Sequence, residues 1–385
     1  MKRFLAVALG LVVAALVLRW SVRPVVSMRP APLVTAPLVA DDVGALAEVL
    51  VHYVPESEAQ IEPSYRDFLG TLPASTRVVV VHPTGAEEKA RAFLARIGTK
   101  AQTRLVPVTT RLGIWSKDRA LVLGGESDRT MLLVPAKPRP GESGRPQDWN
   151  IVPAVVAAMP DHLAYRELPI AFDAGDFAIA DDRVLYDVNL YDRNRGRGYP
   201  SPVAFHERLK TMLGRDALML GSSAGDVPRH HMSMYMAPIG GNEVLVGDPA
   251  AGAELVGRDY RPGERSPETN EPFVSDTSPE TVARFEHAAN DLHRLGFRVV
   301  RIPTLTFDPK TYFAYTNGVF ETRDGARHVW MPVFDVPALD DAARAVYVSL
   351  GFTVHPVHVR ALYPQHGTIG CVVNVLAREP SRTRT

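Results

Sequence analysis

Short apolar runs alternate with amphipathic segments along most of the chain. Val78–Val81 is a continuous β-branched run, typical of a strand buried on both faces. Glu87–Ile97 has the apolar spacing of an amphipathic helix that ends at Gly98. The apolar positions within 41–52 are also spaced as in a helix, so a helix is predicted there. The pattern therefore predicts an α/β protein.

The order helix, strand, polar residue and hairpin recurs along the chain. Helices are predicted over 148–158, 201–213, 278–295 and 337–350. Strands are predicted at 105–108, 168–172, 217–220, 298–302 and 353–359. Hairpins are predicted within 120–134, 177–187, 234–246 and 319–331, where turn residues separate two apolar runs.

A polar residue stands at the same place in each repeat, between the strand and the hairpin. These residues are Asp118, Asp173, His231, Asn317 and Cys371. They are separated by 55, 58, 86 and 54 positions, and the long interval contains 249–277, which is rich in proline, glycine and charge and is predicted to be an inserted surface loop. Self-similarity at such a period indicates a propeller or a solenoid. Five units would then direct five polar side chains at a common axis.

Composition excludes several classes of function. Of 385 residues, 46% are hydrophobic and 22% charged, as in an ordinary globular protein with a sizeable core. Lys+Arg 43 balances Asp+Glu 43, which argues against a broad basic face for nucleic acid. The single cysteine excludes an internal disulfide and a C-x-x-C zinc or haem site.

The N-terminus reads as a targeting segment. Lys2 and Arg3 precede the apolar run Phe4–Leu18, as in a secretory signal, and the run is shorter than the about 20 residues that span a bilayer. No small-x-small cleavage site follows. Residues 1–23 are therefore predicted to be a signal peptide or an N-terminal membrane anchor, with the protein exported to a bacterial-type cell envelope.

A proline-rich linker is predicted at 24–40, before a single domain over 41–380. No cofactor is expected, and the oligomeric state is left open.

The lone cysteine has two readings. Cys371 follows a glycine-rich turn and precedes an apolar run in the stretch His366–Leu376. A free cysteine is among the most often buried residues, so a packing role has to be weighed. A thiol delivered by a turn is also a plausible nucleophile. The other polar residues of the repeat favour the nucleophile.

These residues suit a cationic, planar substrate. Carboxylates at Asp118, Asp173 and Asp176 can hold a guanidinium by charge-assisted hydrogen bonds and fix its carbon before a nucleophile. A thiolate at Cys371 would attack, and His231 would donate and then accept a proton.

The motifs resemble those of the guanidino-modifying superfamily. Five motifs follow the superfamily's order over about residues 70–377. They are Trp115-Ser116-Lys117-Asp118, Asp173-Ala174-Gly175-Asp176, the motif at His231, the asparagine motif at Asn317 and the glycine-rich turn before Cys371. The superfamily contains agmatine deiminase, bacterial peptidylarginine deiminase, arginine deiminase, dimethylarginine hydrolase and the amidinotransferases.

The resemblance implies a five-bladed α/β propeller (the pentein fold), with pseudo-fivefold repeats and no metal. It also implies a small-molecule guanidine or arginine-containing substrate. By matching position, Cys371 would be the nucleophile and His231 the acid/base. Asp118 and Asp173 would also be catalytic, with Asp118 pairing with Trp115 on the substrate. Asp176, Asn317 and Ser233 would be further substrate-binding residues.

The sequence departs from the superfamily's pattern at four positions. Lys117 stands for an arginine, Ala174 for a glycine, Ser233 for an aspartate that grips guanidinium, and Gly370 for a residue that is often histidine. Three alternatives therefore stay open: a deiminase-like hydrolase, an amidinotransferase, and a catalytically lapsed guanidine-binding protein.

Two other motifs point to different chemistry. Gly221-Ser222-Ser223-Ala224-Gly225 matches the nucleophile elbow of serine hydrolases, although no helix is predicted to follow it directly. His230 and His231 could form a metal pair, but neighbouring residues on a strand point to opposite faces, which argues against it.

Overall fold

The computed structural model describes residues 34, 36–124, 129–139, 145–181 and 183–379. The predicted signal or anchor and most of the predicted linker lie outside these residues. Among the described helices, none has both the length and the apolar character that crossing a bilayer requires.

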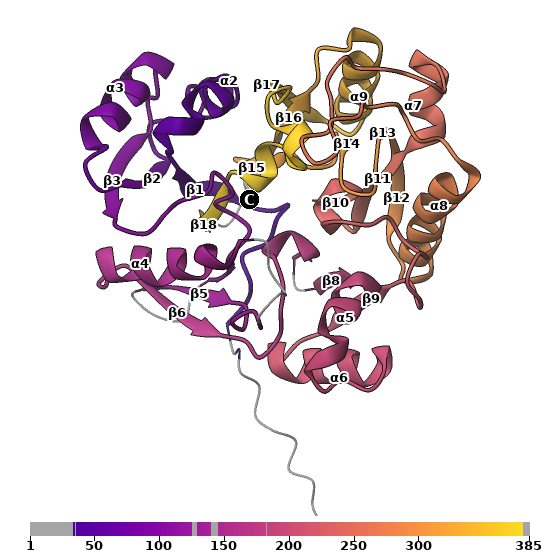
Figure 1. Cartoon of the computed structure of the whole chain (residues 1–385), viewed down its shortest axis with the longest axis horizontal. Helices are drawn as coiled ribbons and strands as arrows, with labels where there is room; N and C mark the ends of the chain where they lie inside the picture. The colour runs from indigo at the N-terminus through magenta and orange to yellow at the C-terminus, as the bar shows by residue number, and fades with distance from the viewer. Residues whose placement is uncertain (1–33, 35, 125–128, 140–144, 182, 380–385) are drawn as a thin grey trace, which may run out of the picture.

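The described chain forms six sheets, and all but one two-stranded ribbon are built to one plan (Figure 1). In each of the other five sheets an antiparallel pair of strands is followed, through one or more helices, by a strand parallel to the second member of the pair. Across each sheet the order is β18 (Asn374–Glu379), β1 (Ala45–His52), β2 (Arg77–Pro83) and β3 (Gln102–Val108); β4 (Leu121–Leu123), β5 (Thr130–Val134) and β6 (Leu163–Glu167); β7 (Phe177–Ala180), β8 (Arg183–Asp187) and β9 (Ala217–Leu220); β10 (Met236–Gly240), β11 (Glu243–Asp248) and β12 (Arg298–Pro303); and β15 (Val319–Arg323), β16 (Ala326–Val333) and β17 (Phe352–His358).

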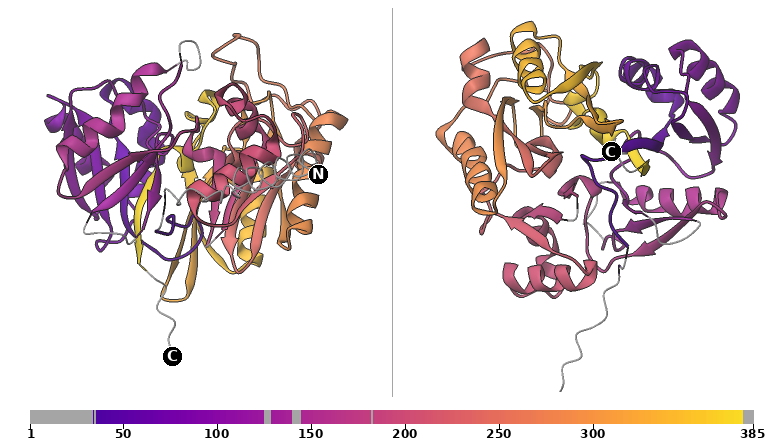
Figure 2. Two further views of the ribbon diagram at one scale, coloured as in Figure 1. Left: turned by 90° about the horizontal axis from the view of Figure 1, so that it is seen from below. Right: turned by 180° about the vertical axis from the view of Figure 1, so that it is seen from behind.

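The helices connect an antiparallel pair to its parallel strand, or one parallel strand to the next. They are α2 (Glu58–Leu69), α3 (Glu87–Ile97), α4 (Ile151–Ala158), α5 (Val188–Asn194), α6 (Pro202–Leu213), α7 (Pro249–Val256), α8 (Pro279–Arg294) and α9 (Pro337–Ser349). Figure 1 shows the sheets set around a central region with most helices at the rim, and Figure 2 shows the same arrangement from below and behind. The predicted α/β class and repeated units are confirmed.

One sheet is assembled from both ends of the chain. Strand β18, near the C-terminus, pairs antiparallel with β1, and β1 pairs parallel with β2. The helix predicted over 41–52 is therefore wrong. A central strand is covered on both faces, and every residue of β1 after Ala45 is buried, so its apolar run only imitates a helical spacing.

Two further predictions need correction. The strand predicted at 168–172 lies earlier, as β6, an edge strand whose last three residues, Tyr165, Arg166 and Glu167, are exposed. The buried apolar residues that follow β6 instead lead the chain inward to Asp173.

The stretch 249–277 is not all loop, because it begins with α7. Asp248 caps this helix by accepting a hydrogen bond from the Ala251 N–H, and Pro249 occupies its first turn. A short ribbon of β13 (Leu305–Thr306) and β14 (Tyr312–Phe313) was also not predicted. Two-residue strands leave too little periodicity to recognise.

Candidate active site

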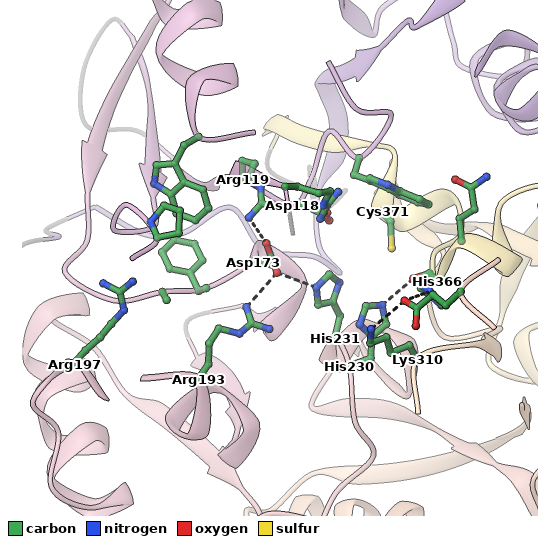
Figure 3. Close-up of a pocket in the computed structure, with 18 residues that line it drawn as sticks. Asp118, Arg119, Asp173, Arg193, Arg197, His230, His231, Lys310, His366 and Cys371 are labelled. Carbon is green, nitrogen blue, oxygen red and sulfur yellow. Dashed lines mark hydrogen bonds and ion pairs between the residues drawn. The ribbon is translucent and has the colours of Figure 1, made fainter. Parts of the chain in front are cut away.

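The five polar residues found from the repeat occupy equivalent positions in the fold. Each lies a few residues before the first strand of an antiparallel pair: β4, β7, β10, β15 and β18 follow Asp118, Asp173, His231, Asn317 and Cys371 respectively. A cavity of about 600 Å³ opens where these chain segments meet (Figure 3). Asp118, Asp173, His231 and Cys371 line it, as does Trp115, whereas Asn317, Asp176 and Ser233 are not among its lining residues.

Cys371 is held from behind by Asn317. The thiol ends a short 3-10 helix, Ile369–Cys371, and the residue is 4% exposed. The Asn317 Nδ2 atom lies 3.0 Å from Cys371 Sγ and 2.9 Å from Met234 Sδ, so the amide donates to the two sulfurs. Asn317 thus lies on the protein side of the sulfur, where its N–H can stabilise a thiolate, rather than on the substrate side that the resemblance implied.

Three glycines allow the polar side chains to approach so closely. A Cβ atom at Gly175 would lie 2.7 Å from His231 Nδ1. A Cβ atom at Gly370 would collide with Asn317 Oδ1, and one at Gly367 would collide with the Trp115 ring. Gly370 is therefore needed for the packing of Asn317 against Cys371.

His231 and Asp173 form a charged pair beside the thiol. His231 Nε2 lies 3.5 Å from Asp173 Oδ2. Burial lowers the pKa of His231, but its hydrogen bonds to Asp173 and Cys371 raise that pKa well above its ordinary value. Burial raises the pKa of Asp173, yet the hydrogen bond to His231 and the charges of Arg193 and Arg119 hold it well below its usual range. An imidazolium–carboxylate pair therefore faces the cavity at neutral pH.

Arginines of the chain itself contact the carboxylates that the sequence singled out. Arg119 donates from Nη1 to Asp173 Oδ1 at 2.6 Å, and its guanidinium lies 5.1 Å from the centre of the Trp149 ring. Arg145 donates to Asp118 Oδ2 at 2.7 Å. These lining arginines were missed from the sequence. The sequence could have indicated only Arg119, because it directly follows Asp118.

Asp176 has a structural position. Its Oδ2 accepts from the Asp173 N–H at 2.8 Å and from Arg193 Nη1 at 2.6 Å. The two aspartates form a capping box around the 3-10 helix Ala174–Asp176. Burial raises the pKa of Asp176. Asp176 thus fixes the backbone and guanidinium around Asp173 instead of facing the cavity.

Ser233 lies in a separate, smaller cavity next to Asn317 and Gly370. It belongs to the 3-10 helix Met232–Met234, and its carbonyl accepts from Thr316 Oγ1 at 3.2 Å. The structure therefore does not bring Ser233 to the position of a guanidinium-binding carboxylate.

Two further histidines line the cavity. His230 has a φ of 76°, so its ring stacks on that of His231 with centroids 4.2 Å apart, and the expectation that the two rings point apart is wrong. His230 Nε2 lies 2.8 Å from the carbonyl oxygen of His366. His366 lines the cavity beside them. In the described part of the chain, no group of three or more histidine, cysteine, aspartate or glutamate side chains could hold a metal ion.

The serine-elbow motif does not form an elbow. Ser222 and Ser223 donate their hydroxyls to Asp226 at 2.8 and 2.7 Å. Strand β9 leads into bends and turns, and the next regular element is the 3-10 helix Met232–Met234 rather than an α-helix. Ser223 does not line the cavity that holds Cys371.

Helix α5 brings Arg193 to the site and begins at a buried carboxylate. Asp187 accepts from the Asn189 N–H at 3.0 Å as its N-cap and from the Tyr235 hydroxyl at 2.7 Å. Burial raises the pKa of Asp187 to about 7, although the hydrogen bond from Tyr235 lowers it.

The pH dependence of the unfolding free energy tests the raised pKa of Asp187. In the unfolded chain the carboxyl titrates at about 3.9, so the native state binds more protons and loses stability through this group as pH rises from about 4 to about 7. The Asp187→Asn variant should lack that loss, and its unfolding free energy relative to wild type should rise between pH 4 and pH 8 in urea titrations. The exposed Asp216→Asn variant is the control, and a pH-independent difference for Asp187→Asn would contradict the assignment.

Comparison with known proteins identifies the fold. No family model matches the chain, and no curated protein matches its sequence. The agmatine deiminase of C. jejuni is 13% identical and superposes with a TM-score of 0.64, covering 90% of this chain and 98% of that one. The agmatine deiminase of Enterococcus faecalis is 12% identical, with a TM-score of 0.62 and coverage of 92% and 100%. The chain therefore has the fold of these enzymes, as the resemblance of its motifs implied.

Proposed function

We propose that the protein is a hydrolase that cleaves a C–N bond of a guanidine or amidine substrate through a covalent intermediate on Cys371. The observation that carries the proposal is the convergence of Cys371, His231, Asp173 and Asp118 on one cavity, from four sheets of the fold. The likeness in fold to agmatine deiminases supports it. We also propose that the five sheets built to one plan form the blades of a pentein propeller around this site.

The first half-reaction would use the thiolate. The His231 imidazolium and the Asn317 amide stabilise negative charge on Cys371 Sγ. Asp118 accepts from the guanidinium N–H groups and orients the central carbon. The sulfur forms a bond to that carbon, and His231 protonates the departing nitrogen. The C–N bond breaks, ammonia departs, and a thiouronium remains bound to Cys371.

The second half-reaction hydrolyses the covalent intermediate and returns the enzyme to its resting state. His231, now neutral, takes a proton from water, and the resulting hydroxide attacks the thiouronium carbon. The C–S bond breaks, the hydroxyl proton of the intermediate passes to solvent as the neutral ureido product leaves, and the thiolate and imidazolium are regenerated. Asp173 keeps the His231 ring oriented and stabilises its charged form throughout.

A substrate panel tests the reaction. Wild-type protein is incubated with linear guanidines, and ammonia and ureido product are measured together. Equal amounts of both products support the hydrolase, whereas transfer of the amidino group to an added amine without ammonia supports an amidinotransferase. Binding without turnover would identify a catalytically lapsed protein. The Ser223→Ala variant should match wild type, and loss of its activity would revive the serine mechanism.

The proton donor predicts an alkaline limit of activity. Because His231 must be protonated when the leaving nitrogen departs, kcat/KM should fall as pH rises through its raised pKa. The His231→Gln variant should lose about 10²- to 10⁴-fold in kcat, and its residual activity should lack this decline. An unchanged alkaline limb in the variant would assign the limb to another group.

A further inference from the structure

The cavity carries no excess of negative charge. Among the described residues that line it, five are cationic, Arg119, Arg145, Arg193, Arg197 and Lys310, and three are carboxylates, Asp118, Asp173 and Glu268. Asp148 and Asp176 lie behind the arginines and pair with them. With these two carboxylates included, the formal charge of the described side chains is zero, and the His231 imidazolium and the Cys371 thiolate cancel each other.

The carboxylates also have internal cationic partners. Asp118 accepts from Arg145 at 2.7 Å, and Asp173 accepts from Arg119 at 2.6 Å and from Arg193 at 3.2 Å. A doubly cationic substrate would therefore add two positive charges to a site whose negative charges are already balanced. A substrate with one positive and one negative group adds none.

The cationic side chains are not spread evenly along the cavity. Figure 3 shows Arg197 on the side of Asp173 that is opposite to Cys371, whereas Arg193 lies directly beside Asp173. Arg197 donates from Nη2 to the Lys137 carbonyl at 3.2 Å, and the Arg193 side chain is 38% exposed. The Arg197 guanidinium thus lies at the end of the cavity away from the thiol, with Arg193 between it and the His231–Asp173 pair.

We propose that the substrate carries a carboxylate at the end opposite to its guanidine or amidine, and that Arg197 binds this carboxylate while the reacting carbon faces Cys371. The inference rests on the proposed function and names its substrate class. Arginine side chains are suited to carboxylates because their planar N–H groups match the two oxygens. An amine in the same position meets like charge, so agmatine becomes a poor substrate despite the fold of its deiminases.

A matched pair of guanidines tests the charge at the far end. Agmatine and 5-guanidinopentanoate have the same four-carbon chain and differ only in ending with an ammonium or a carboxylate. Wild-type protein should show kcat/KM at least about tenfold higher for the carboxylate, the size of one charged hydrogen bond. A kcat/KM for agmatine equal to or above that for the acid would overturn the inference and leave the hydrolase standing.

Arg197 is the residue to change, because Arg193 also holds Asp173 and Asp176. The Arg197→Gln variant should raise KM for the carboxylate by about tenfold and change agmatine turnover little or improve it. The Arg197→Lys variant should recover part of the preference. Arg139 donates to the Gly196 carbonyl at 2.6 Å and does not line the cavity, so Arg139→Gln is the matched control. An undiminished preference in Arg197→Gln would contradict the placement of the carboxylate.

Failure of the reaction is separated from failure of the inference by calorimetry. If no guanidine is turned over, the proposed function fails, and the affinities of Cys371→Ala protein for the two compounds decide the substrate class. Tighter binding of the acid supports the inference, and equal or tighter binding of agmatine rejects it.

Discussion

Replacing Cys371 by alanine is expected to reduce turnover of every guanidine substrate by about 10⁴-fold or more, the scale of losing a covalent nucleophile. No other thiol exists in the chain, so no neighbouring cysteine can take over. The sulfur lies on the cavity wall beside His231 and accepts from Asn317 at 3.0 Å. Alanine removes the attacking atom and leaves both partners in place. The measurement is steady-state release of ammonia and ureido product.

The same variant separates catalysis from packing. Cys371 is buried, so the lost sulfur costs about 1 kcal/mol, and the melting temperature should fall by only a few degrees. Guanidine binding to Cys371→Ala should persist in calorimetry, and Cys371→Ser should be equally inactive while keeping the side-chain volume. Full turnover in the alanine variant would refute the thiol mechanism. A melting temperature lowered far more than this would assign the cysteine mainly to packing.

The repeat carried most of what the sequence could predict. Hairpins are encoded by turn residues between apolar runs, and helices such as Glu87–Ile97 by a local period, so both were found. The polar residue before each hairpin then located four cavity-lining side chains without a structure. Strand β1 was missed because its pairing with β18 joins the two ends of the chain, and no local pattern encodes that contact.

The electrostatics of the site could not be predicted in the same way. Arg145 reaches Asp118 from 27 residues away, and Arg193 reaches Asp176 from 17. Such pairs depend on how neighbouring segments fold against each other, and the sequence shows only that arginines and aspartates are common. A carboxylate that seemed ready for a substrate guanidinium already has a guanidinium partner within the chain. The proposal about the charge of the substrate therefore rests on the structure and not on the sequence.

The departure at Gly370 has a physical explanation in the same structure. The motif has glycine where a larger residue often precedes the nucleophile. That departure was one reason for keeping the alternative of a catalytically lapsed protein. The backbone at Gly370 instead packs against Asn317: the Gly370 N–H donates to the Asn317 carbonyl at 3.2 Å, and Thr368 Oγ1 donates to the same oxygen at 2.7 Å. There is no room for a side chain between them. The glycine is thus part of the support of the thiol.

The Gly370→Ala variant should therefore lose activity through a single methyl group. The added Cβ must push Asn317 away or move the backbone that carries Cys371, and a displacement of about 1 Å in an active site costs about 10²-fold in rate. Overpacking should also cost about 1–3 kcal/mol of stability. Gly124→Ala is the matched control, since its Cβ would meet Val39 at an ordinary 3.7 Å, and it should keep wild-type kcat. The readouts are kcat and urea unfolding. If Gly370→Ala retains both kcat and stability, the close packing of Asn317 does not position the thiol, because a rigid support would have been displaced by the methyl group.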